Sequence, residues 1–277
     1  MTGLLLATDL SPHGDRALSR AALLAASHGG TLHVVPRDLL TKAGLAAALE
    51  QAARMLHDDL ADAGLQADLA VLEMIRAGEP DQAIVQAARE AESDMIVLSA
   101  PHADLLVQMF RGSVQNRVVR AAPSPVLGVR RRARQQYRRI VVAVDLSQPA
   151  RRALDVALRL LPNAVMAEVE LGVVHAGVTE ASADQMAEER AQVNDMVTGS
   201  LARLAAEGRT APRRVTTEIV TGDAVPVIAA AVAAQQAELV VVGTLGLTGM
   251  ANLLLGSTAE ALLGVLPCDV LAVRQPA

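Results

Sequence analysis

One stretch near the carboxyl end of the chain has residue types that suit binding of a phosphate group. The segment from Gly243 to Glu260 reads GTLGLTGMANLLLGSTAE, with glycines at its start and Gly256-Ser257 near its end. Glycine lets backbone N–H groups approach an anion closely because it has no Cβ. Ser257 and Glu260 match a capping box, which predicts a helix start whose free N–H groups and dipole face that anion. The spacing alone leaves a plain glycine-rich turn open as the alternative.

The same loop differs from the two commonest nucleotide signatures. Gly243, Gly246 and Gly249 do not form the pattern G-x-G-x-x-G, and no Gly-Lys-Ser/Thr follows them. The loop also contains no Lys, Arg or His. Phosphoryl transfer needs a cationic clamp on the transferred group and a residue that positions the attacking oxygen. We therefore expect a binding site without catalytic residues, with at most weak hydrolysis of what it binds.

The elements that must position this loop are repeated along the chain. An apolar run closed by Asp occurs at residues 4–9 and again at 140–145, and each is followed by Ser, Pro and a helical pattern. From Gly78 onward the two halves align without a gap at a constant offset of 144 residues. Strands that alternate with helices predict parallel βαβ units with right-handed crossovers. The fold class is therefore α/β, with a doubly wound parallel sheet in each half.

Five strands are predicted in each half. In the first half they lie at 4–9, 31–35, up to Ile75, 94–98 and 125–129, and in the second at 140–145, 170–174, up to Val220, 238–242 and 269–273. Long helical patterns are predicted around 45–63 and 183–206. We divide the chain into a first domain, residues 1–130, a basic linker, residues 131–138, and a second domain, residues 139–277. The arginine-rich run between the halves is interpreted as a solvated linker rather than a nucleic-acid surface.

The composition restricts the class of protein further. The 277 residues carry a formal net charge of -5, which argues against a protein that covers nucleic acid. Aromatic residues make up only 1% of the chain, so the core must consist of aliphatic side chains. The single cysteine cannot form an intrachain disulfide, and an acid follows the first apolar run too early for a signal peptide or a membrane span. A cytoplasmic location is the expectation.

The segment Gly243-x2-Gly246-x9-Gly256-Ser257 resembles the ATP-binding motif of the universal stress protein family, and the spacing matches at every fixed position. The resemblance covers both halves of the chain. It implies an adenine-nucleotide alpha-hydrolase-like fold, in which each five-stranded sheet has the strand order 3-2-1-4-5. It also implies ATP as the ligand, accompanied by Mg²⁺, and a stress-response regulator or sensor as the function.

The resemblance also implies which residues contact the nucleotide. Adenine and ribose are expected between the ends of the first two strands of the second half, at Ala143, Val144, Asp145 and Val173. The phosphates are expected against Val242, Gly243, Leu245, Gly246, Gly256, Ser257 and Thr258. The residues alone leave Asp145 open as a helix-capping or turn acid.

The first half departs from this motif. The offset places Ser99 and His102 at the positions of Gly243 and Gly246, whereas Gly112 and Ser113 keep the Gly-Ser pair. Pro101 stiffens the turn and removes an N–H donor. We expect the first half to bind nucleotide weakly or not at all, although Asp9 and Val34 still mark an adenine position and a protonated His102 could pair with a phosphate.

Little other chemistry is visible in the sequence. The remaining histidines have no metal-ligand spacing and are interpreted as structural or exposed residues: His13, His28, His33, His57 and His175. Cys268 begins a predicted buried strand and is interpreted as a core residue. The last strands, ending at Val129 and Val273, are candidate edges for pairing of the domains, and formation of a homodimer is left open. The alternatives to a nucleotide-binding regulator are a nucleotide-hydrolysing or adenylate-forming enzyme and a scaffold that binds protein only.

Overall fold

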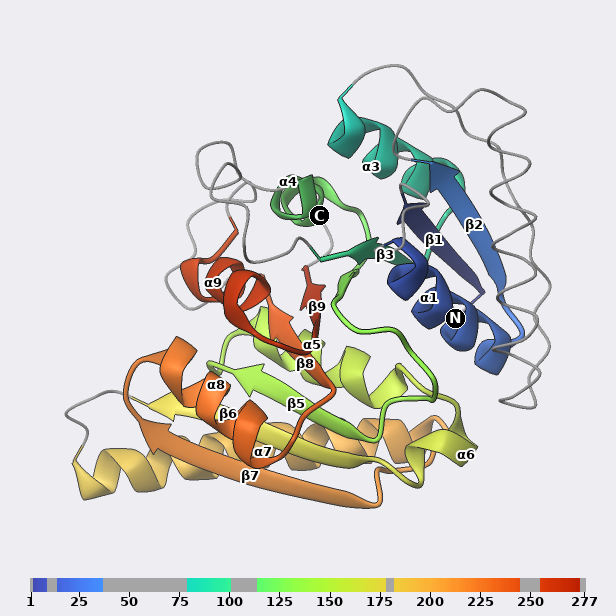
Figure 1. Ribbon diagram of the computed structural model, residues 1–277. Coiled ribbons are helices and arrows are strands. Elements are labelled where there is room, and N and C mark those ends of the chain that lie inside the picture. Colours follow the sequence, from blue (N-terminus) through green and yellow to red (C-terminus); the bar gives the residue numbers. More distant parts are fainter. Residues whose placement is uncertain are drawn as a thin grey trace. The chain divides into compact units, whose positions relative to one another are not determined.

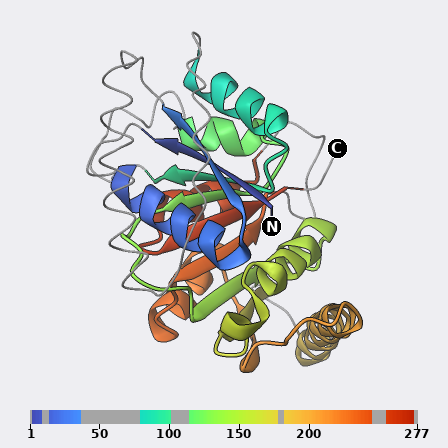
Figure 2. The same cartoon turned by 90° about the vertical axis from the view of Figure 1, so that its right-hand side faces the viewer.

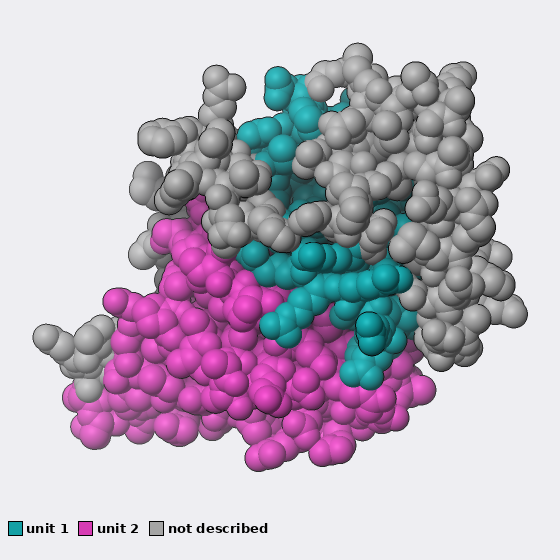
Figure 3. All heavy atoms as spheres, in the orientation of Figure 1, with its two compact units in different colours: residues 1–136, 276 teal, residues 137–275, 277 magenta. Residues whose placement is uncertain are grey.

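The computed structural model describes residues 2–8, 14–36, 79–100, 114–177, 182–244 and 255–274. It divides into two compact units (Figure 3), unit 1 from Met1 to Gln136 and unit 2 from Tyr137 to Gln275. The described residues form nine strands, four in unit 1 and five in unit 2. The α/β class and the parallel pairing of the strands within each unit are confirmed.

The sheet of unit 2 has the predicted order. Its strands are β5 (Arg139–Val144), β6 (Glu170–Gly177), β7 (Arg214–Thr221), β8 (Leu239–Gly243) and β9 (Asp269–Val273). All neighbouring strands are parallel, and they lie in the order β7-β6-β5-β8-β9. Counted within the unit, this order is 3-2-1-4-5. The central strands are buried on both faces, as continuous Val, Ile and Leu runs predict.

Helices cover both faces of this sheet. They are α5 (Gln148–Arg159), α6 (Asn163–Met166), α7 (Ala183–Ala206), α8 (Ala224–Ala234) and α9 (Ser257–Val265). Figure 1 shows α8 in front of the sheet, and the turned view in Figure 2 places α5 and α7 on the opposite side. Ser147 caps α5 by accepting a hydrogen bond from the Ala150 N–H, and a capping box formed by Ser182 and Gln185 starts α7.

Unit 1 has the same arrangement over the residues that are described. Its elements are β1 (Gly3–Thr8), α1 (Gly14–His28), β2 (Thr31–Pro36), α3 (Pro80–Glu90), β3 (Met95–Ser99), α4 (Val114–Ala121) and β4 (Val126–Val129). The strands lie in the order β2-β1-β3-β4 and are parallel. The description of the first half therefore has four strands where five were predicted, because the strand predicted to end at Ile75 lies outside the described residues, as does the helical pattern at 45–63.

The run between the halves is not simply a solvated linker. Its carbonyl groups accept hydrogen bonds from α1, with Arg16 Nη1 3.0 Å from the Arg130 oxygen and Arg20 Nη1 2.9 Å from the Gln135 oxygen. Ala133 is buried, whereas the arginines on either side of it are exposed. The first residue of unit 2, Tyr137, is fully buried. The run therefore packs on unit 1 through its backbone and presents its charges outward.

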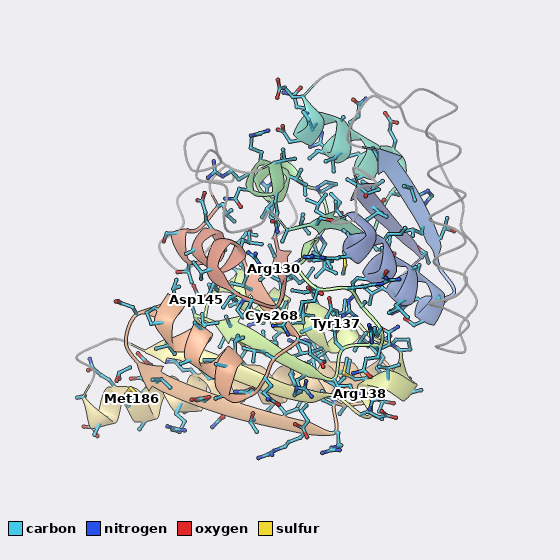
Figure 4. All side chains as sticks on the ribbon, viewed as in Figure 1. Arg130, Tyr137, Arg138, Asp145, Met186 and Cys268 are labelled. Carbon is cyan, nitrogen blue, oxygen red and sulfur yellow. The ribbon has the colours of Figure 1, made fainter. Side chains whose placement is uncertain are left out.

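Tyr137 also fixes the start of unit 2 (Figure 4). Its hydroxyl donates a 2.6 Å hydrogen bond to Asp269 Oδ2, and both side chains are buried. A buried carboxylate requires such a partner because leaving it unpaired costs a large desolvation free energy. The only tyrosine of the chain therefore connects the segment before β5 to the first residue of β9.

The start of β1 in unit 1 depends on a second acid. Asp94 Oδ2 accepts hydrogen bonds from the backbone N–H groups of Thr2 and Gly3. Burial by itself would raise the pKa of Asp94, but these hydrogen bonds outweigh it and lower the pKa below its usual value.

Among the described helices, none is both long enough and apolar enough to cross a membrane.

Candidate functional site

The loop after β5 places Asp145 at the carboxyl edge of the unit 2 sheet. Its Oδ1 atom accepts hydrogen bonds from Ser147, 3.2 Å from the backbone N–H and 2.5 Å from the hydroxyl. Leu146 between them has a φ of 63° and is therefore in the left-handed region, which bulky residues seldom adopt. The N-cap of α5 is Ser147 rather than Asp145. Oδ2 of the half-buried Asp145 has no hydrogen bond with any described residue.

The second strand of unit 2 is longer than predicted. We expected it to end at Val174, but β6 continues to Gly177. Val173 is consequently fully buried within the strand, paired with Val142, instead of lying at the edge. The residue beside Val144 in the register of the two strands is His175. Sequence reasoning missed this extension because His175 and Ala176 break the aliphatic run that marked the strand.

Gly243 ends β8 and is required for a reason that the sequence did not reveal. A Cβ at this position would lie 2.9 Å from the Pro149 carbonyl carbon and 3.0 Å from both the Ala150 nitrogen and the Pro149 Cβ. These atoms belong to the first turn of α5, which therefore packs directly against the backbone of β8. Gly243 thus allows the helix that follows Asp145 to approach the end of β8.

The start of α9 also differs from its prediction. The N-cap is Gly256, with no side-chain capping bond, and Ser257 is the exposed first residue of the helix. The capping box predicted for Ser257 and Glu260 is therefore wrong, since a capping box needs the hydroxyl at the N-cap. Gly256 instead donates a 2.7 Å backbone hydrogen bond to Thr244, the residue after β8. No described side chain caps the first N–H groups of α9.

The predicted site residues converge where the strand order of unit 2 reverses. Ala143 of β5 pairs with Val242 of β8, so the ends of the first and fourth strands of the unit are neighbours. Ligands of open parallel sheets bind beyond such a point. Val144 ends β5 and is followed by Asp145, and Gly243 ends β8. The backbone bond between Thr244 and Gly256 brings the start of α9, with Ser257 and Thr258, to the same edge.

Two predicted residues of the loop, Leu245 and Gly246, lie outside the described residues. In unit 1 the same holds for Asp9, His102, Gly112 and Ser113. Ser99 ends β3 and pairs with Val129, at the position that Gly243 holds in unit 2. Val34 is buried inside β2, as Val173 is inside β6. The part of the chain that the structure describes contains no group of three or more His, Cys, Asp or Glu side chains able to hold a metal ion.

Comparison with known proteins identifies the family of this repeated fold. The model of the universal stress protein family matches residues 1–130 and again residues 136–274. The chain belongs to the universal stress protein family. A curated relative from Thermus aquaticus, named "Universal stress protein in QAH/OAS sulfhydrylase 3'region", is 33% identical over 136 residues. The match spans 46% of this chain and 97% of the relative, so the relative corresponds to one of the two domains.

Solved structures resemble the whole tandem protein. A universal stress protein from Archaeoglobus fulgidus DSM 4304 superposes with a TM-score of 0.67 at 24% identity, covering 99% of this chain and 96% of that one. A functionally unknown protein from Pseudomonas aeruginosa PAO1 has a TM-score of 0.66 at 20% identity, covering 100% and 93%. The two superpositions, which cover nearly the whole chain, establish a shared fold. The two family matches confirm the expectation of a tandem universal stress protein, and the solved structures confirm its adenine-nucleotide alpha-hydrolase-like fold.

Proposed function

We propose that unit 2 of this universal stress protein binds ATP, with Mg²⁺, at the carboxyl edge of its sheet and acts as a non-catalytic stress-response regulator. The observation that carries the proposal is the start of α9. Its N-terminus has no side-chain cap from the described residues, and Gly256 joins it to Thr244, directly after β8 and beside the strand-order reversal. An uncapped helix N-terminus offers free N–H groups and a positive dipole end to an anion.

The adenine and ribose would lie at the end of β5. Asp145 is half-buried and has Oδ1 held by Ser147, so the free Oδ2 has a defined direction from which to accept a hydrogen bond. A carboxylate can only accept, and the exocyclic amino group of adenine and the ribose hydroxyls can donate to it. Ala143 and Val144 would supply apolar contact for the base.

The phosphates would lie against the other half of the edge. Ser257 adds an exposed hydroxyl to the free N–H groups at the start of α9. Gly243, with Leu245 and Gly246 of the loop predicted from the sequence, would complete the contacts. Magnesium in nucleotide sites is held largely by phosphate oxygens and water, with one or two carboxylates at most. Asp145, the half-buried acid that follows β5, is a carboxylate at this edge that fits that mode.

We propose a regulatory rather than a catalytic role because the loop lacks the cationic residue types that phosphoryl transfer needs. Between Gly243 and Glu260 the sequence contains no Lys, Arg or His to stabilise charge on a transferred phosphoryl group. A site that binds ATP without turning it over can report the nucleotide through a change in its interactions with a partner. We also propose that unit 1, with Ser99 at the position of Gly243, binds nucleotide weakly or not at all.

Calorimetric titration of the purified full chain with ATP, with and without Mg²⁺, tests this function. We expect one ATP per chain and turnover close to the uncatalysed rate. Asp145→Asn should weaken ATP binding by about 10- to 100-fold, as loss of a hydrogen bond to a charged group predicts. The matched control is Asp155→Asn, a half-buried position on α5 where the ion pair with Arg203 is lost but the predicted site residues are unchanged.

Three outcomes would contradict the proposal in distinct ways. Absence of binding at millimolar ATP would leave the protein-binding scaffold as the remaining candidate. Steady ATP turnover would instead favour a nucleotide-hydrolysing enzyme. Two equivalent sites per chain would show that the substitutions in the loop of unit 1 are tolerated.

A further inference from the structure

One edge of the unit 2 sheet is open over the part of the chain that the structure describes. β7 pairs with β6 along its full length, from Arg214 opposite Glu170 to Thr221 opposite Gly177. No described strand lies on its other side, and Figure 1 shows β7 as the lower edge of the unit 2 sheet. β6 separates β7 from β5, so this edge lies apart from the residues proposed to bind nucleotide. An open edge presents backbone groups that can pair with a further strand.

The hydrogen bonds to β6 show which backbone groups of β7 point outward. Arg214 donates its backbone N–H to the Val169 oxygen, and Gly222 donates to the Gly177 oxygen, both at 3.3 Å. Successive residues of a strand direct their N–H and C=O groups alternately to its two sides. The even-numbered residues of β7 therefore bond to β6, whereas the groups of the odd-numbered residues, from 215 to 221, point away from it. These outward groups are what a second strand would meet.

β7 has none of the features that commonly protect an edge strand. Edges are usually blunted by a short length, by Pro or Lys, or by a bulge. β7 is eight residues long, reads RVTTEIVT and contains neither Pro nor Lys. Its register with β6 runs from end to end without a bulge. Six of its eight residues are β-branched, the type that packs best in paired strands. The strand is therefore suited to pairing on its open side.

Two charged side chains lie on one face of this strand. Gln235, the C-cap of α8, has Nε2 3.4 Å from Glu218 Oε2, so Glu218 lies on the face that α8 covers. Because side chains alternate along a strand, Arg214 and Thr216 lie on the same face. Arg214 and Glu218 are exposed, and neither forms an ion pair with a described residue. Opposite charges thus stand two residues to either side of Thr216.

One self-pairing register matches these charges. A two-fold axis perpendicular to the sheet keeps each side chain on its own face, so one residue of β7 must lie opposite itself in an antiparallel pair. Centring the pair on Thr216 places Arg214 of each copy opposite Glu218 of the other, and opposite charges at such positions stabilise a sheet. Centring it on either charged residue would oppose like charges. Centring it on Val215 or Thr217 would place both charged residues opposite uncharged ones.

The backbone groups agree with the same register. Val215 then lies opposite Thr217 of the second copy, and both residues direct their backbone groups outward. Each such pair can exchange both of its N–H···O bonds. The Thr216 residues of the two copies form a non-hydrogen-bonded pair, in which the Cα atoms lie about 4.5 Å apart and side chains approach most closely. Arg214 and Glu218 fall at the same kind of position, so the register that satisfies the backbone also brings the charges together.

We propose that β7 is a dimerisation edge, on which two copies of this chain join by antiparallel pairing of β7 centred on Thr216. Arg214 of each copy then pairs with Glu218 of the other. The eight residues of β7 span about 26 Å at about 3.3 Å per residue. A single strand pair of this length buries less surface than a standard protein interface, so the dimer is weak and dissociates on dilution. The pairing needs no nucleotide and goes beyond the proposed function.

Sedimentation equilibrium of the full chain without nucleotide, at about 5 to 500 µM, tests the proposal. Arg214→Glu and Glu218→Arg should each raise the Kd of the dimer by about 5- to 100-fold, because two attractive cross-strand pairs become repulsive. Combining them should restore a Kd close to that of the wild type, which separates loss of pairing from misfolding. Arg151→Glu, at an exposed arginine on α5, makes the same change in net charge and is the matched control.

Disulfide cross-linking tests the register. A Cα separation of about 4.5 Å falls within the range of about 4.4–6.8 Å that a disulfide spans. The only cysteine of the chain, Cys268, is buried. Under mild oxidation Thr216→Cys should form a covalent dimer, since the new cysteine faces itself. Thr217→Cys is the control, because this half-buried neighbour would lie opposite Val215.

Three results would overturn the proposal. The first is a chain that stays monomeric over the whole concentration range. The second is cross-linking of Thr216→Cys no faster than that of Thr217→Cys. The third is a dimer whose Kd is unchanged by either single charge reversal, which would mean that the copies associate through another surface.

Discussion

Replacing Gly243 with alanine should destabilise unit 2 even when no nucleotide is present. The new Cβ would meet the Pro149 carbonyl carbon at 2.9 Å, about 0.6 Å inside the optimal separation of about 3.5 Å between carbon atoms. The opposing atoms are the backbone and ring of the first turn of α5, which cannot rotate away as a flexible side chain could. Relief requires a shift of α5 relative to β8. Overpacking of this kind costs about 1–3 kcal/mol of unfolding free energy.

Urea unfolding followed by tyrosine fluorescence measures this cost. The chain contains no tryptophan, and its only tyrosine, Tyr137, is buried in unit 2, so the signal reports on that unit. For a slope of about 2 kcal/mol per M, the midpoint should fall by about 0.5–1.5 M. Gly264→Ala is the control, because a Cβ there meets no atom within 4 Å and alanine is favoured in a helix such as α9.

A midpoint for Gly243→Ala equal to that of the wild type would refute the packing argument. It would mean that the glycine is present only for a ligand. The expected result has a practical consequence for binding experiments. Loss of ATP binding in Gly243→Ala must be separated from displacement of α5, because that helix begins three residues after Asp145 and Ser147 contacts both.

Three further predictions concern stability. Tyr137→Phe should lower the unfolding free energy of unit 2 by about 1.5–3 kcal/mol, measured by circular dichroism, because it leaves the buried Asp269 without the hydroxyl donor; a neutral effect would mean that another group replaces it. The lowered pKa of Asp94 means that its contribution is present above the unfolded pKa of about 3.9 and is lost as the pH falls through the lower folded value. Acid titrations should therefore show the wild type losing its advantage over Asp94→Asn below about pH 4, and a constant difference would contradict this. Gly128→Ala should destabilise unit 1, since its Cβ would lie 1.9 Å from Gln115 Nε2, and adding Gln115→Ala should relieve the clash; a double variant less stable than Gly128→Ala alone would refute the relief.

The relief in that last pair is expected from the internal repeat. The offset of 144 residues aligns Gln115 with Ala259 and Gly128 with Ala272, so the double variant reproduces the pair that unit 2 already contains. The two units therefore solve the same packing problem between the last helix and the last strand with different residues.

Much of the fold was decided by the order of residues along the chain. Continuous aliphatic runs that alternate with helical patterns predicted the parallel strands, because burial on both faces leaves no place for polar alternation. The repeat predicted two similar units, and the end of β5 at Val144 placed Asp145 at the sheet edge. These features depend on local propensity and on burial, and a single sequence records both.

Only the tertiary structure decided how the edge residues are used. Gly243 proved to accommodate α5, Gly256 rather than Ser257 caps α9, and β6 continues past Val173 to bring His175 against Val144. Each of these depends on atoms that are distant along the chain: 93 residues separate Gly243 from Ala150, and 31 separate His175 from Val144. Sequence patterns indicate which residues are buried or helical, but packing determines the contacts between separate elements. The sequence therefore predicted where the candidate site lies without predicting the contacts inside it.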